Sequence, residues 1–175
     1  WAEVGFCALT LGQPKEAAAM FDKCLNISTA AKILAKPQLL MGQGMLQMIN
    51  GDIPGALATI DEAQRFAEST NMKHYAPFFG LMRGMMHGAS GDTELAMNSL
   101  DESKSIALKL GMLPTALQAN LVIAGIVASQ SDNNTAATAD IVSECENLIQ
   151  QIATSINDSQ ISNAFATAAK AKLPA

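Results

Sequence analysis

Small and large apolar residues recur along the chain with a period of about 40 positions. Gly5, Gly44, Gly84 and Gly125 are separated by 39, 40 and 41 residues. A small residue follows each glycine by twelve positions and a large apolar residue follows it by sixteen: Ala17 and Phe21, Ala56 and Ile60, Ala96 and Leu100, and Ala137 and Ile141. Because residues four apart lie on one face of a helix, the pattern predicts a second helix packed closely against a first helix at its glycine.

The residues between these positions predict a tight turn within each pair. A residue that tolerates a left-handed conformation follows each glycine by seven positions: Gly12, Gly51, Gly91 and Asp132. Prolines or capping residues then predict the start of a second helix: Pro14, Asp52 with Pro54, Asp92, and Asp132 with Asn133 and Asn134. We call each repeat of this pattern a copy. Pro37 and Pro77 suit the first turn of the first helix in copies two and three, and Pro114 is a less exact counterpart in copy four.

The whole pattern predicts an all-α domain of about four helix pairs followed by a closing helix. No alternating run of Val, Ile and Thr bounded by turn residues competes with it. A chain of 175 residues has the length of a single domain. We expect the pairs at 1–36, 37–76, 77–116 and 117–157, and the closing helix at 159–172.

The first copy resembles the signature of the tetratricopeptide repeat. Successive signature positions are occupied by Trp1, Val4, Gly5, Ala8, Gly12, Ala17, Phe21 and Cys24, although the family has aromatic residues where Ala8 and Pro14 stand. The resemblance implies a right-handed α-solenoid whose first helices line the concave face and whose second helices form the convex face. The period exceeds the usual 34 residues by about one and a half to two helical turns, which we expect to lengthen the second helices.

Repeats of this longer period resemble the C-terminal regions of signal-transduction ATPases, some bacterial adenylate cyclases and ATPase-type transcriptional activators. The segment 60–112 and the ending 156–165 carry this likeness. It implies a protein-interaction or sensor module of a signalling protein. Because the chain begins at Trp1 and not at Met, we expect it to be a piece of a longer protein.

Composition narrows the classes of partner. The chain is 49% hydrophobic and 15% charged, with a net charge of −5 and a pI of about 4.9, which disfavours direct contact with nucleic acid. Its longest apolar run, 121–128, is too short to cross a bilayer, so no membrane partner is expected. Cys7, Cys24 and Cys145 form no disulfide or metal-binding pattern, which fits a reducing cytoplasm.

Charge is missing from the expected first helices. The ranges 37–49 and 117–130 contain no Asp, Glu, Lys or Arg, and 77–89 contains only Arg83. The tetratricopeptide resemblance places ten apolar residues on the concave groove: Phe6, Leu9, Met41, Met45, Met48, Phe78, Leu81, Met85, Val122 and Ile126. Family members that clamp a peptide carboxylate use Lys, Arg and Asn there, whereas a methionine-rich groove suits an apolar helix or segment.

Other roles for these positions stay open. Methionines at helical spacing usually fill cores, so a packing role is favoured for each single Met, and a groove role is considered for the face as a whole. The bound segment could come from another protein, from the same parent chain, or from a second copy in a homodimer. A small-molecule-sensing regulatory domain and a structural or self-association scaffold are the alternatives to a protein-binding module.

The sequence carries no pattern of catalytic chemistry. The zinc-protease, P-loop, nucleophile-elbow and Cys-x-x-Cys motifs are absent. His74 and His87 stand thirteen residues apart, without a Cys or Glu at the spacing of metal ligands. We therefore expect no enzyme activity, no catalytic residue, no metal and no cofactor.

Overall fold

Helices make up almost all of the described structure. The computed structural model describes residues 1–25, 29–129 and 135–174, and these contain no β-strand. The elements are α1 (Ala2–Thr10), α2 (Pro14–Leu25), α3 (Thr29–Ile49), α4 (Ile53–Ser69), the 3₁₀ helix η1 (Lys73–Tyr75), α5 (Ala76–Ala89), α6 (Thr93–Lys109), α7 (Leu113–Ser129), α8 (Thr135–Ser155) and α9 (Ser159–Lys170). The prediction of an all-α chain is therefore confirmed.

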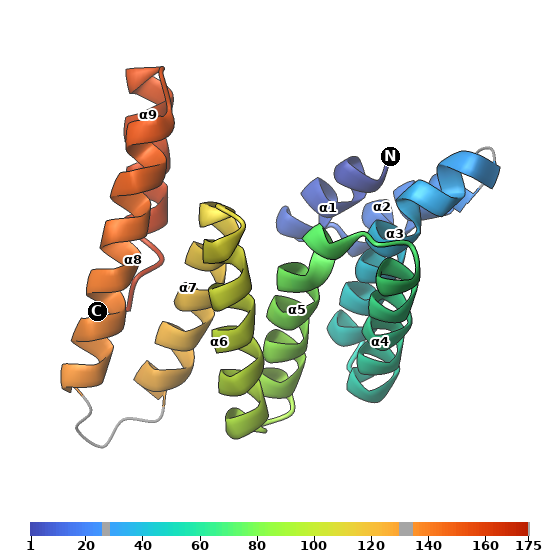
Figure 1. Ribbon diagram of the computed structural model, residues 1–175, viewed down its shortest axis with the longest axis horizontal. Coiled ribbons are helices and arrows are strands. Elements are labelled where there is room, and N and C mark those ends of the chain that lie inside the picture. Colours follow the sequence, from blue (N-terminus) through green and yellow to red (C-terminus); the bar gives the residue numbers. More distant parts are fainter. Residues whose placement is uncertain (26–28, 130–134, 175) are drawn as a thin grey trace.

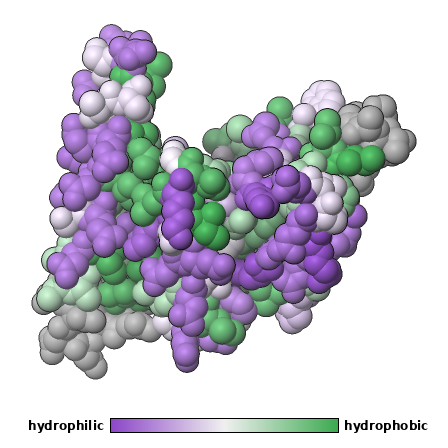
Figure 2. Space-filling view, in the orientation of Figure 1, coloured by the Kyte–Doolittle hydropathy of each residue, from purple (hydrophilic) through white to green (hydrophobic). Residues whose placement is uncertain are grey.

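Successive helices pack against one another in chain order (Figure 1). Each α-helix contacts the next one, from α1 through to α9. The helices α1, α3, α5 and α7 also contact one another in sequence, and we call these four the inner helices. In the view of Figure 1, α4, α6 and α8 lie in front, and Figure 2 shows that hydrophilic side chains cover most of this face.

Three of the four predicted glycine contacts are present. A Cβ added to Gly84 would overlap the Leu100 side chain of the following helix, and it would lie 3.2 Å from the carbonyl oxygen of Ala96. The same relation is found in two earlier pairs. A Cβ added to Gly5 would lie 2.6 Å from the Phe21 ring, and a Cβ added to Gly44 would lie 3.1 Å from the Ile60 side chain. The absence of a side chain on these glycines therefore lets the second helix of each pair lie against the backbone of the first.

The turns within the first three pairs also follow the prediction. A positive φ is found at each turning glycine: Gly12 (+70°), Gly51 (+83°) and Gly91 (+82°). Asp52 accepts a hydrogen bond from the backbone N–H of Gly55 at 3.0 Å, and Asp92 accepts one from that of Leu95 at 3.3 Å. These two aspartates cap α4 and α6. The predicted turn at 132–134 lies outside the described residues.

Two predicted boundaries fall inside helices. Pro37 was expected to open a helix, but α3 begins at Thr29 and Pro37 lies buried within it. The preceding residues 30–36 are rich in Ala, Leu and Lys, which favour helix strongly enough to extend it through the proline. The division at 36/37 therefore cuts α3, and the division at 116/117 cuts α7.

The fourth pair is out of register with the sequence alignment. Gly125, expected at a helix crossing, is exposed, and an added Cβ would meet no atom within 4 Å. Ala124 is fully buried instead, 40 residues after the corresponding glycine of α5. In α8, Cys145 is buried and stands 42 residues after the buried Ser103 of α6, whereas Glu144, which has the spacing of the aligned glycines, is exposed. The connection between α7 and α8 is therefore two residues longer than that between α5 and α6.

This shift turns Glu144 outward, where it meets polar partners from two other helices. Its carboxylate accepts hydrogen bonds from Lys104 Nζ at 3.2 Å and from Asn120 Nδ2 at 3.1 Å. Burial raises the pKa of the Cys145 thiol to about 11, the Glu144 carboxylate adds to the rise, and Lys104 opposes it. The group joins α6, α7 and α8 at the outer side of the fourth pair.

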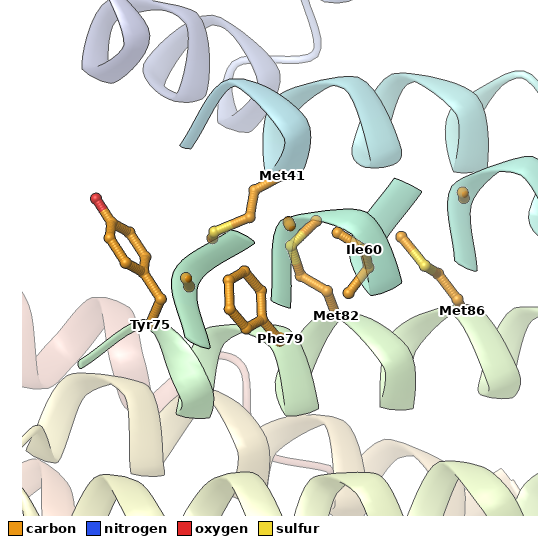
Figure 3. Packing of buried hydrophobic residues seen from close by; sticks show 9 residues of the cluster. Met41, Ile60, Tyr75, Phe79, Met82 and Met86 are labelled. Carbon is orange, nitrogen blue, oxygen red and sulfur yellow. The ribbon is translucent and has the colours of Figure 1, made fainter. Parts of the chain in front are cut away.

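The cluster shown in Figure 3 joins α3, α4 and α5 and supports the surface that is described below. Ile60, Phe79 and Met86 lie at its centre and are at most 1% exposed. Met41 and Met82 belong to the same cluster and lie at its edge. A hydrogen bond also connects α6 to α5: the buried Ser103 hydroxyl donates to the Pro77 carbonyl oxygen at 2.6 Å.

The glycine contacts predict opposite effects for two alanine substitutions. Gly84→Ala forces a methyl group into Leu100 and should lower the free energy of unfolding by about 1–3 kcal/mol. Gly125→Ala adds a methyl group in open space on a helix and should raise it by about 0.5–1 kcal/mol. Urea denaturation of the two variants measures both changes, and equal effects would contradict the register that we describe.

The three thiols should react at different rates. Cys7 is exposed, whereas Cys24 and Cys145 are buried, and the raised pKa of Cys145 further reduces its thiolate fraction. At pH 8 we expect one thiol per folded chain to react quickly with a chromogenic disulfide reagent, and all three after unfolding. Cys7→Ser should remove the fast phase, and a fast phase that persists in this variant would place Cys24 or Cys145 at the surface.

Candidate functional site

A groove with a volume of about 610 Å³ crosses the inner helices. Its walls are mainly apolar side chains from α1, α3, α5 and α7. Eight of the ten predicted groove residues line it: Phe6, Leu9, Met41, Met45, Phe78, Leu81, Met85 and Val122. The fold thus gathers residues from four separate helices into one continuous surface.

The other two predicted residues, Met48 and Ile126, do not line the groove. Met48 packs against the cluster that joins α3, α4 and α5, and Ile126 packs against the cluster that joins α5, α6 and α7. Each stands about one helical turn beyond the last groove residue of its own helix, Met45 or Val122. The groove therefore ends about one turn before these two residues.

Two of the eight predicted residues that line the groove also belong to the core. Met41 is 8% exposed and Leu81 is 7% exposed, so most of each side chain is already packed. Phe6, Met45 and Met85 are half-buried and leave more of their surface open to the groove. The groove floor is therefore made by core residues, and the freely available apolar surface comes from the half-buried ones.

The groove lining includes a further set that the sequence prediction missed: Glu3, Thr10, Gln38, Tyr75, Met82, Gln118, Leu121 and Lys172. A signal for Glu3 was present, because it lies one turn before Phe6 on the same helix face. Lys172 follows α9 and reaches the groove only through tertiary packing. The groove therefore carries one carboxylate and one ammonium group in addition to the apolar residues predicted.

Glu3 is held in place by the neighbouring inner helix. The Gln38 side chain of α3 donates a hydrogen bond from Nε2 to Glu3 Oε1 at 2.9 Å. Both side chains are accessible to solvent, and both line the groove. This contact joins α1 to α3 and fixes a negative charge at the α1 end of the groove.

Tyr75 connects the polar rim of the groove to the core. Its ring stacks near Phe79 with centroids 6.1 Å apart, and Figure 3 shows its hydroxyl oxygen pointing away from the cluster. Burial raises the pKa of this hydroxyl, and the Glu3 carboxylate raises it further. Tyr75 is therefore a neutral hydroxyl beside a carboxylate over a wide range of pH.

Comparison with family models, curated proteins and solved structures finds no significant match for this chain. Among the described residues, no group of His, Cys, Asp and Glu could hold a metal ion. Within the same residues, no helix is long and apolar enough to cross a bilayer. The groove is therefore the feature of the described structure that points to a function.

The titration of Tyr75 tests the electrostatics of this rim. Tyr75 is the only tyrosine of the chain, so its ionisation can be followed by ultraviolet absorbance. We expect a midpoint above the ordinary value of about 10, and Glu3→Gln should lower it without restoring that value, because burial is the larger cause. The pKa of Tyr75 is higher in the folded chain than in the unfolded chain. The stabilisation that comes from the neutral hydroxyl is therefore complete below about pH 10, and it is lost as the pH rises through the pKa of the folded state.

Glu94→Gln provides the matched control, since Glu94 is an exposed carboxylate of α6 that does not line the groove. It should leave the Tyr75 midpoint unchanged. A midpoint that responds equally to both substitutions would show a general effect of net charge and not a specific effect of Glu3.

Proposed function

We propose that this chain is a protein-interaction module of tetratricopeptide-repeat type, which binds an apolar helix or segment of a partner protein. The observation that carries the proposal is the groove of about 610 Å³ lined by apolar residues from four inner helices. The repeated close contacts at Gly5, Gly44 and Gly84, and the sequential contacts of the inner helices, support a right-handed α-solenoid as its architecture.

The chemistry of the groove favours an apolar partner surface. Met45, Met85 and Phe78 are half-buried and lie among other apolar side chains. Methionine side chains are flexible and polarisable, so a methionine-rich wall adapts to helices of different shapes. An amphipathic helix that lays its apolar face into such a groove removes both surfaces from water.

The breadth of the groove favours a protein segment over a small ligand. A volume of about 610 Å³ also falls in the range of small-molecule sites, which makes a sensing domain the second candidate. The lining, however, extends from α1 across all four inner helices to the residue after α9. A compact ligand would contact one part of this wall, whereas a helical segment would contact all of it.

The same proposal covers the setting of the module. We place it in a cytoplasmic signalling protein, in line with the long-period resemblance and with three free cysteines, which a reducing compartment would keep as thiols. Self-association through the groove is the remaining alternative, and light scattering over a concentration series distinguishes it from binding to another protein.

Acidic substitutions in the groove should abolish partner capture. Met45→Asp and Met85→Asp each place a carboxylate against an apolar partner face, which costs desolvation energy without an opposing charge. We expect proteins captured from a lysate by the wild-type chain to be lost with both variants, as measured by quantitative mass spectrometry.

Leu108→Asp is the matched control, because Leu108 is an exposed apolar residue of α6 outside the groove lining. This variant should retain the captured proteins. Thermal unfolding of all three variants separates loss of binding from loss of folding. Retention of every captured protein by both folded methionine variants would contradict the proposal.

A further inference from the structure

The groove carries opposite charges at its two ends. Glu3 lies on α1, and Lys172 follows α9. The inner helices contact one another in the order α1, α3, α5 and α7, and Leu173 packs in the same cluster as Leu121 of α7. Glu3 therefore marks the α1 end of the groove and Lys172 marks the end beyond α7.

Neither charge is neutralised within the part of the chain that the structure describes. Among these residues, ion pairs involve neither Glu3 nor Lys172. Glu3 is positioned by the Gln38 amide, and the backbone at Lys172 is held by its N–H···O bond to Ala169 at 3.1 Å. The α1 end of the groove thus presents a positioned carboxylate, and the other end presents an exposed ammonium group that forms no ion pair among the described residues.

The surface between these charges is apolar, with a narrow polar rim. Phe78, Met85 and Leu121 lie between the two ends, while Tyr75 and Gln118 supply neutral polar groups. A partner that covers the apolar part would exclude water from the neighbourhood of both charges. Each charge would then need an opposite charge on the partner, because an unpaired desolvated charge is costly.

We propose that the groove accepts a helical segment with an apolar stripe, a basic side chain at one end and an acidic side chain at the other. The basic end lies at Glu3 and the acidic end at Lys172. The inference rests on the proposed function, since it specifies the partner of the same groove. Four helices spaced by about 9 Å span about 27 Å, which corresponds to a helix of about 18 residues.

Three synthetic helices test the assignment. They share one leucine stripe and a length of about 18 residues, and they end in Lys and Glu, in Lys and Lys, or in Glu and Glu. Fluorescence anisotropy with the full chain measures their affinities. We expect the Lys/Glu peptide to bind about two- to five-fold more tightly than the other two. Its Lys can be at either terminus, because the helix can lie in the groove in either direction.

Charge reversal on the protein should change this preference in a defined way. Glu3→Lys gives the groove two cationic ends and should favour the Glu/Glu peptide, whereas Lys172→Glu should favour the Lys/Lys peptide. Both positions are exposed, so thermal unfolding should stay close to wild type. Glu3→Gln, a milder change at the same position, should reduce the preference without reversing it.

The outcomes separate this inference from the function on which it rests. Equal binding of the three peptides, with affinity lost in Met45→Asp, would overturn the charge assignment and leave the apolar groove in place. Failure of all three peptides to bind would overturn both. A preference that ignores Glu3→Lys and Lys172→Glu would place the discriminating charges elsewhere and overturn the assignment.

Discussion

The close approach of two helices at a residue without a side chain is the contact on which the rest of this structure depends. At Gly84 the Leu100 side chain occupies the space that a Cβ would need, and Gly44 and Ile60 stand in the same relation. Such a contact fixes the distance and the rotation of the second helix relative to the first. The contact recurs in three successive pairs, and the inner helices of these pairs lie next to one another and share one surface.

That shared surface has to satisfy two demands. Met41 and Leu81 are needed to fill the core, while Met45 and Met85 stay partly open. The groove is therefore continuous with the packing that stabilises the helices, and a partner seated in it would extend an existing core. Its charged groups stand at the edges, where Glu3 and Lys172 keep contact with water.

The fourth pair shows that the packing of the helices tolerates a longer connection between them. A connection longer by two residues shifts α8 relative to α7, so that Cys145 occupies the buried position and Glu144 turns outward. The displaced carboxylate gains Lys104 and Asn120 as partners and joins three helices. Helix packing sets the register here, and the length of the connection adapts to it.

The helices, the turning glycines and most of the groove could be predicted from the amino-acid sequence. These features are local or periodic: a glycine with positive φ, a capping aspartate, and apolar residues on one helix face each act within a few residues. The eight groove residues could be predicted because each copy presents the same face of its first helix.

The features that depend on contacts between distant segments could not be predicted in this way. Met48 and Ile126 do not line the groove, although each lies about one turn from a residue that does, because the three-dimensional course of the helices sets where the groove ends. Ala124 is buried and Gly125 is exposed, because helix packing decides which residue of α7 faces the neighbouring helices. Lys172 reached the groove because the chain after α9 packs beside α7, and no spacing along the chain encodes that approach.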